Sequence, residues 1–314
     1  MIAAVEPSPS LLYALGGVFA ILVIASIVPT VLRRWRPRGD YTELSQRVRT
    51  WWIMACVFAL ALVVGRVASL VLFGFLSFLA LKEYLSLIPT RRADRRALFW
   101  AYLAIPVQYV WVGMEWYGMF IIFIPVYVFL FLPMRMMLSG ETKGFLRATG
   151  TLHWGLMTMV FSLSHAAYLL ALPGEKNPNG GGAALLLFLV FLTEFNDVAQ
   201  YVWGKLFGRR KVVPSISPGK TWAGLVGGVL TTTALATLLG GLLTPLTRVQ
   251  SVGAGLIIGL AGFAGDVVVS SLKRDLGIKD SGTMLPGHGG ILDRIDSLSY
   301  AAPLFFHYLY YLHY

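Results

Sequence analysis

Nine apolar runs, most of them near 20 residues long, constrain this 314-residue sequence more than any other feature. A helix of about 20 apolar residues is long enough to cross the hydrocarbon core of a bilayer. The run at 51–81 is too long for one span, and Gly65 followed by Arg66 interrupts it, so we expect a hairpin of two short helices there. The sequence therefore predicts an all-α polytopic membrane bundle of about nine to ten transmembrane helices. The runs cover residues 11–32, 51–81, 98–114, 117–134, 151–172, 183–203, 222–243, 252–270 and 298–312.

The composition excludes several other classes of protein. Hydrophobic residues make up 57% of the chain and charged residues only 13%, whereas soluble domains contain about 45–50% apolar and about 25% charged residues. A soluble globular enzyme, a disordered chain and a fibrous repeat are therefore excluded. The single cysteine, Cys56, excludes a disulfide framework and a zinc site built from cysteines.

The 26 Lys and Arg residues fall mainly on one side of the predicted bundle. If the N-terminus lies outside, 23 of them lie in the loops of the opposite face, within residues 33–50, 82–97, 135–150, 204–221 and 273–296. Positively charged loops stay in the cytoplasm, so we expect an outside N-terminus in a multi-pass protein of the cell membrane. This placement accounts for the net charge of +11 without a nucleic-acid partner.

Carboxylates also occur inside the apolar runs, where ionisable groups are costly and mark functional sites. Glu194 and Asp197 are three residues apart, which places both on one helix face. Asp266 lies in another run, and a turn of about 100° per residue places Ser270 and Lys273 on its face. These two helices are therefore predicted to carry polar chemistry toward the cytoplasm.

The loop that follows, residues 273–296, combines four cations, four carboxylates, His288 and five glycines. Glycine permits close backbone approach to a ligand, and a His-Gly-Gly sequence before a helix leaves backbone N–H groups free to bind phosphate. Asp293 and Asp296 are again three residues apart. Carboxylates bind Mg²⁺ and cations bind phosphate oxygens, so the loop predicts a metal–nucleotide site on the cytoplasmic face rather than a solvated charged loop.

Residues 215–222 contain Gly-Lys-Thr, a sequence that also occurs in phosphate-binding P-loops. The upstream glycine of that motif is absent and no strand is expected before it, which excludes a P-loop. Lys220 is then either a phosphate ligand or a membrane-boundary anchor beside Trp222, and both interpretations remain open.

Residues 270–296 resemble, at all 27 positions, the signature of membrane CTP:phosphatidate cytidylyltransferases, also called CDP-diacylglycerol synthases. The resemblance extends over about 183–300. It suggests a division into transmembrane helices over 1–182, for scaffold, lipid and dimer contacts, and a catalytic region over 183–314. The signature fixes Ser270, Lys273, Arg274, Lys279, Asp280, Gly282, Pro286, His288, Gly289, Gly290, Asp293, Arg294 and Asp296.

Two upstream segments match the family less closely. Gln200 stands where the family pattern has Ala, Gly219 replaces a Lys, and Ala223 replaces a Glu. These departures indicate a divergent branch, whose lipid substrate can differ from plain phosphatidate.

The resemblance implies a Mg²⁺-dependent reaction in phospholipid biosynthesis, in which CTP and phosphatidate give CDP-diacylglycerol and pyrophosphate. It also implies a homodimer, contacts with membrane phospholipids, and a metal pair of Mg²⁺ with K⁺ held by the carboxylates that match Asp266 and Asp293. On this basis we assign catalytic roles to Asp197, Asp266, Lys273, Arg274 and Asp293, and metal binding to Asp266, Asp293 and Asp296. The predicted ligands of the CTP or lipid phosphates are Ser217, Lys220, Ser270, Lys279, His288, Gly289, Gly290 and Arg294.

Two other functions remain as alternatives. A CTP-dependent polyprenol or phytol kinase would transfer the γ-phosphoryl group to an alcohol and release CDP. An ion-coupled transporter would carry charges through the whole depth of the membrane, and its halves would be related by a repeat.

Overall fold

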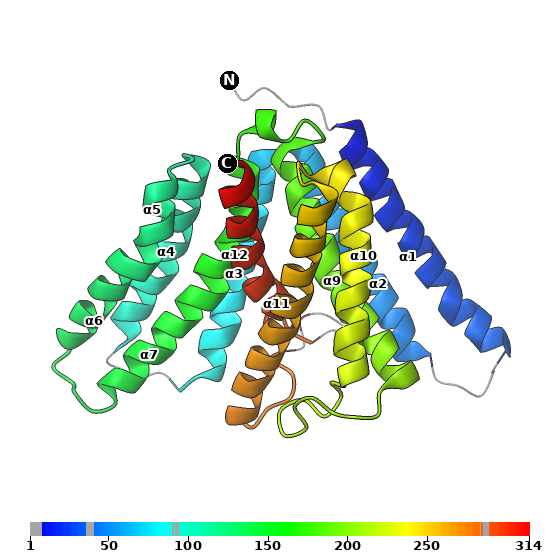
Figure 1. Cartoon of the computed structure of the whole chain (residues 1–314). Helices are drawn as coiled ribbons and strands as arrows, with labels where there is room; N and C mark the ends of the chain where they lie inside the picture. Colours follow the sequence, from blue (N-terminus) through cyan, green and yellow to red (C-terminus); the bar gives the residue numbers. More distant parts are fainter. Residues whose placement is uncertain (1–7, 36–40, 90, 92–93, 283, 285–288) are drawn as a thin grey trace.

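The computed structural model describes residues 8–35, 41–89, 91, 94–282, 284 and 289–314 (Figure 1). Its regular structure within these residues is helical, with one isolated β-bridge between Lys211 and Thr221. The predicted all-α class is therefore confirmed.

Eight segments are long and apolar enough to cross a membrane, by length and composition. Two of them, Tyr117–Met137 and Phe145–Ala171, are each built from several consecutive elements. Two further helices, α4 (Arg95–Gly113) and α12 (Leu292–His313), complete the ten-helix arrangement expected from the sequence. The remaining elements are α1 (Pro9–Trp35), α2 (Thr42–Val64), α3 (Arg66–Leu87), α5 (Tyr117–Ile122), the π-helical turn η2 (Phe123–Val128), α6 (Phe129–Met137), α7 (Phe145–Gly155), the π-helical turn η3 (Leu156–Ser162), α8 (Leu163–Tyr168), the short 3₁₀ turns η4 (Leu169–Ala171) and η5 (Gly174–Lys176), α9 (Gly181–Phe207), α10 (Trp222–Leu243) and α11 (Arg248–Asp275).

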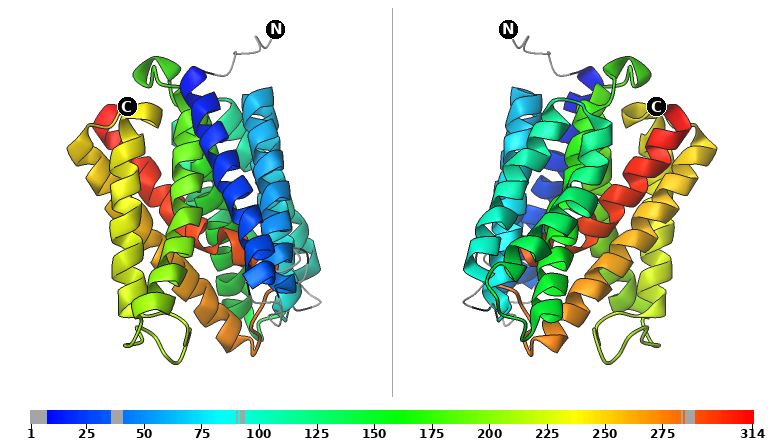
Figure 2. Two further views of the ribbon diagram at one scale, coloured as in Figure 1. Left: turned by 90° about the vertical axis from the view of Figure 1, so that its right-hand side faces the viewer. Right: turned by 90° about the vertical axis from the view of Figure 1, so that its left-hand side faces the viewer.

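The long helices run between two ends of the bundle, as the side views in Figure 2 show. The start of α1 and the end of α12 lie at the same, upper end in Figure 1, as an even number of crossings requires. The α9–α10 loop and the start of the α11–α12 loop lie at the lower end. These two loops, both rich in Lys and Arg, therefore lie or begin at the same end of the bundle, as predicted.

The predicted hairpin within residues 51–81 is confirmed, because α2 ends at Val64 and α3 begins at Arg66. Gly65 between them has φ 125°, a conformation that a residue with a Cβ rarely adopts. The Arg66 guanidinium donates hydrogen bonds to the Glu115 carboxylate and, at 3.1 Å, to the carbonyl of Val112. This contact fixes the hairpin to the turn that follows α4.

Close packing of α9 to α12 depends on glycines. A Cβ at Gly255 of α11 would overlap the backbone of α10 at Thr233, and one at Gly265 would overlap the carbonyl of Asp296 in α12. Small residues allow the backbones of membrane helices to approach in this way. Gly265 therefore brings its neighbour Asp266 beside the first turns of α12.

The N-terminal and C-terminal regions share one apolar core. α12 packs against α3, η3 and α8, and a single cluster of buried side chains includes residues from both regions. The aromatic ring of Phe306 in α12, for example, lies 5.5 Å from that of Tyr168 in α8. The position of α12 is therefore fixed from both sides of the predicted boundary at residue 182.

Candidate active site

The loop between α9 and α10 directs Lys220 into the bundle. Its two arms are joined by two backbone hydrogen bonds. The N–H of Val212 donates to the carbonyl of Lys220 at 3.1 Å, and the N–H of Trp222 donates to the carbonyl of Arg210 at 3.0 Å. Thr221 then caps α10, because its hydroxyl accepts the N–H of Gly224 at 3.1 Å. With its backbone fixed on both sides, Lys220 lies inward instead of extending to the membrane surface.

Lys220 joins three carboxylates from three different helices. Its Nζ lies 2.5 Å from Oδ2 of Asp266, and the two side chains are 19% and 21% exposed. Asp197 of α9 and Asp296 of α12 are close enough to Lys220 and Asp266 to interact electrostatically with them. We call Lys220, Asp197, Asp266 and Asp296 the lysine–carboxylate cluster.

The charge state of Lys220 follows from this environment. Burial alone would lower the pKa of its ammonium group, but the carboxylates of Asp266 and Asp197 outweigh burial and raise that pKa above its ordinary value. Lys220 is therefore a cation at neutral pH. Three acidic side chains lie near this one ammonium group, and Glu194 and Arg294 lie close enough to interact with Asp296.

Hydroxyl and backbone donors orient the carboxylates. The Ser270 hydroxyl donates to Asp266 Oδ1 at 3.1 Å, one helical turn away on α11. Ser297 donates from its hydroxyl to Asp197 Oδ2 at 2.9 Å and from its backbone N–H to Asp296 Oδ1 at 2.7 Å. Among the described residues, the buried Oδ1 of Asp197 receives no hydrogen bond. That oxygen is a free acceptor on a residue of the cluster.

Asp293 belongs to a second set of contacts. Lys273 Nζ lies 2.6 Å from its Oδ1, and both side chains are almost fully buried. Its Oδ2 accepts the N–H and the hydroxyl of Ser281, at 3.0 and 2.8 Å, and the N–H of Gly290 at 3.0 Å. We call Asp293, Lys273, Ser281 and Gly290 the Asp293 cluster. Its hydrogen bonds hold the segment before α12 against the end of α11.

Glu83 was not predicted from the sequence, and it contacts the Asp293 cluster and the start of α12 from another helix. This residue of α3 accepts the N–H groups of Ile291, at 2.9 Å, and Leu292, at 3.1 Å, and the hydroxyl of Ser281. A local signal was available, because the residue before α12 is Ile291, which has no side-chain oxygen to cap the helix. Nothing in the sequence indicates that the cap comes from α3.

The other predicted residues lie around these two clusters. Arg274 is exposed, and its Nε donates to the carbonyl of Ile216 at 3.0 Å, which ties α11 to the α9–α10 loop. Lys279 is exposed and Ser217 is half-buried. Arg294 is half-buried, and its Nε donates no hydrogen bond to any of the described residues. Gly289 has φ 79°, and His288 lies outside the described residues.

The donor set is suited to a hard cation. Carboxylate and hydroxyl oxygens are the ligands that Mg²⁺ prefers, and Asp197, Asp266 and Asp296 bring three acidic side chains close to one another. The unpartnered Oδ1 of Asp197 is one such oxygen. Within the described residues, no group of three or more His, Cys, Asp or Glu side chains lies, as the structure stands, where it could hold a metal ion. These residues fit a divalent ion that would take over contacts now made by Lys220.

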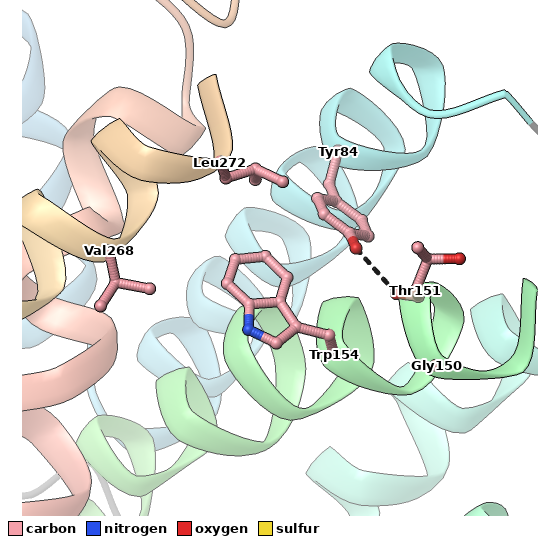
Figure 3. Close-up of a pocket in the computed structure, with 6 residues that line it drawn as sticks. All are labelled: Tyr84, Gly150, Thr151, Trp154, Val268 and Leu272. Carbon is pink, nitrogen blue, oxygen red and sulfur yellow. Dashed lines mark hydrogen bonds between the residues drawn. The ribbon is translucent and has the colours of Figure 1, made fainter. Parts of the chain in front are cut away.

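A mainly apolar cavity of about 310 Å³ lies between α3, α7 and α11 (Figure 3). The rings of Tyr84 and Trp154 lie 5.3 Å apart on one side, and the Tyr84 hydroxyl donates to the carbonyl of Thr151 at 2.7 Å. Leu272, which lines the cavity, directly precedes Lys273 of the Asp293 cluster. A residue that lines the cavity is therefore the neighbour in sequence of a buried cation.

Comparisons with known proteins agree with these features. Residues 45–312 match the family model described as "Cytidylyltransferase family". The uncharacterized protein YnbB of Escherichia coli (strain K12) is 47% identical over 299 residues, which cover 95% of this chain and 98% of YnbB. A phosphatidate cytidylyltransferase of Haemophilus influenzae is 41% identical over 41% of this chain and 46% of its own length, and one of Staphylococcus aureus (strain COL) is 35% identical over 48% and 59%. The matches to the two named enzymes thus span about half of their length.

Proposed function

Because the chain belongs to the cytidylyltransferase family, we propose that it transfers the cytidylyl group of CTP to phosphatidate. The products are CDP-diacylglycerol and pyrophosphate. The observation that carries this proposal is the lysine–carboxylate cluster, where α9, α11 and α12 bring three acidic side chains to one buried cation. Such an arrangement suits a nucleotide bound with a divalent metal.

In the proposed reaction, a phosphate oxygen of phosphatidate attacks the α-phosphorus of CTP in line. A new P–O bond forms, and the bond to the pyrophosphate leaving group breaks. The nucleophile is already an anion, so the protein contributes mainly position and charge neutralisation. Lys220 and Arg294 are proposed to bind CTP phosphates, and Lys273, with Arg274 at the rim, is proposed to bind the lipid phosphate.

Mg²⁺, when bound, would neutralise phosphate charge, and Asp197, Asp266 and Asp296 are the proposed ligands. Asp293 remains a predicted ligand of a second cation. Its Oδ1 would have to exchange the Lys273 ammonium for that ion, because both carboxylate oxygens already accept donors.

The lipid is proposed to approach from the side of the cavity in Figure 3. Val268, Leu272 and Trp154 offer apolar surface to an acyl chain, while Lys273 is next in sequence to Leu272. A lipid with one chain in this cavity would bring its phosphate to the level of the Asp293 cluster. We also propose that this level is the cytoplasmic boundary, since the basic α9–α10 loop lies at the same end.

The test is an assay of the purified protein with labelled CTP, phosphatidate and Mg²⁺. Formation of CDP-lipid and pyrophosphate is expected, with a loss of about 10²-fold or more in Asp266→Asn. The matched control is Lys205→Ala, which removes an exposed lysine of α9 whose ammonium lies over the Tyr201 ring. Release of CDP with a phosphorylated lipid would instead identify a kinase, and no CTP-dependent product would refute the proposal.

A further inference from the structure

Glu83 is the residue through which the N-terminal region contacts the signature segment. Its two carboxylate oxygens accept the N–H groups of Ile291 and Leu292 and the hydroxyl of Ser281. A Cβ at Gly290 would overlap Glu83 Oε1, and one at Gly282 would lie 3.2 Å from Oε2. Two glycines of the signature therefore leave the space that this carboxylate fills.

The carboxylate also supplies what the start of α12 lacks. The first N–H groups of a helix have no intrahelical acceptor, and its N-terminus carries partial positive charge. Ile291, the residue before α12, has an apolar side chain and makes no capping hydrogen bond. The Glu83 carboxylate accepts the N–H groups of Ile291 and Leu292. The carboxylate of Asp293, in the first turn of α12, accepts the N–H of Gly290.

This arrangement changes the expected use of the glycine segment. The sequence predicted free backbone N–H groups before α12 that would bind phosphate. In the structure, the N–H groups of Gly290, Ile291 and Leu292 all donate to carboxylates of the protein itself. A phosphate at this helix end would have to displace both carboxylates.

We propose that Glu83 is a positioning residue, which fixes Asp293 and the first turn of α12 and keeps phosphate away from this helix end. The Ser281 hydroxyl lies between the two carboxylates and has a single proton, so it bonds one of them at a time. Glu83 thereby acts on Asp293 through Ser281 and the backbone of residues 290–292. The consequence for turnover rests on the proposed function, whereas the consequence for the backbone does not.

The test compares Glu83→Ala and Glu83→Gln with the full-length protein in detergent. Amide hydrogen exchange of peptides covering 289–296 should be at least about tenfold faster in Glu83→Ala, because two N–H groups lose their acceptor. Turnover of CTP should fall about 10- to 100-fold, with the KM for CTP changed less than about threefold, as expected for a misplaced group that does not bind CTP. Glu83→Gln retains one acceptor oxygen, so its exchange rate and its turnover should lie between those of the wild type and of Glu83→Ala.

Added formate should restore part of the exchange protection and of the turnover in Glu83→Ala, because a small carboxylate can occupy the space left by the side chain. It should have no effect on Glu43→Gln, the control at an exposed glutamate whose partner is Arg47 one turn along α2. Wild-type exchange rates in Glu83→Ala, or slow turnover of the folded Glu83→Ala protein that formate leaves unchanged, would overturn the proposal. A wild-type protein without CDP-lipid formation would refute the proposed function, and the exchange rates would still decide the role of Glu83.

Discussion

Replacing Lys220 by Met removes a buried positive charge and keeps most of the side-chain volume. In the structure the Lys220 and Asp266 side chains are 19% and 21% exposed, and their charged atoms are 2.5 Å apart. Removing one partner of a buried ion pair costs about 3–5 kcal/mol, since the other charge stays buried without compensation. We expect about 3 kcal/mol, the lower end of that range, because each side chain keeps about a fifth of its exposure.

The assay is thermal unfolding of the purified protein in detergent with EDTA. A loss of about 3 kcal/mol should lower the Tm of Lys220→Met by about 5 °C or more. The pKa of Lys220 is raised, so its ion-pair stability is fully present below the ordinary lysine value of about 10.4 and is lost only as the pH rises through the higher folded value. The difference in Tm should therefore be the same at pH 7 and pH 9.

Magnesium provides the second measurement. A divalent ion that binds Asp197, Asp266 and Asp296 would replace the missing ammonium, so Mg²⁺ should raise the Tm of Lys220→Met more than that of the wild type. Lys205→Met, at the exposed lysine of α9, is the control and should match the wild type in both measurements. If Lys220→Met had the Tm of the wild type and the same increase in Tm with Mg²⁺, the Lys220 ammonium would not stabilise the carboxylates of the cluster as described.

Three further outcomes test other parts of the structure. Val268→Trp should fill the cavity of Figure 3 and raise the KM for phosphatidate without raising that for CTP; equal effects on both would argue against a lipid site there. Gly265→Ala should lower both Tm and turnover, by about 1–3 kcal/mol in stability, because its Cβ would overlap the Asp296 carbonyl; an unchanged Tm would contradict that packing. Arg66→Gln should lower the Tm with little change in turnover, since this residue joins the hairpin to the turn after α4 through Glu115 and Val112, and a selective loss of turnover would contradict that role.

The helices and the hairpin could be predicted because their causes are local. Apolar length sets a span, and a glycine before an arginine ends one helix and begins another. The shared face of Asp266 and Ser270 also follows from helical periodicity, and the structure shows it as a hydrogen bond of 3.1 Å. Each of these features involves residues no more than a few positions apart.

The pairing of the charges could not be predicted, because it depends on tertiary structure. Lys273 shares a face with Asp266 in sequence, yet it pairs with Asp293, which lies 20 residues away. Lys220 was equally compatible with a surface anchor until the backbone of its loop was known. The Glu83 contacts span about 200 residues and join helices that have no recognisable sequence relation.

The same contact has a consequence for biosynthesis in the membrane. Ile291 leaves the ribosome 208 residues after Glu83, and six membrane crossings are made between α3 and α12. Until α12 arrives, the acidic side chain of α3 faces the bundle without the amides it will receive. Completion of the Asp293 cluster is therefore a late event in assembly, and an agent that delays insertion of α12 would leave a nearly complete bundle without this cluster.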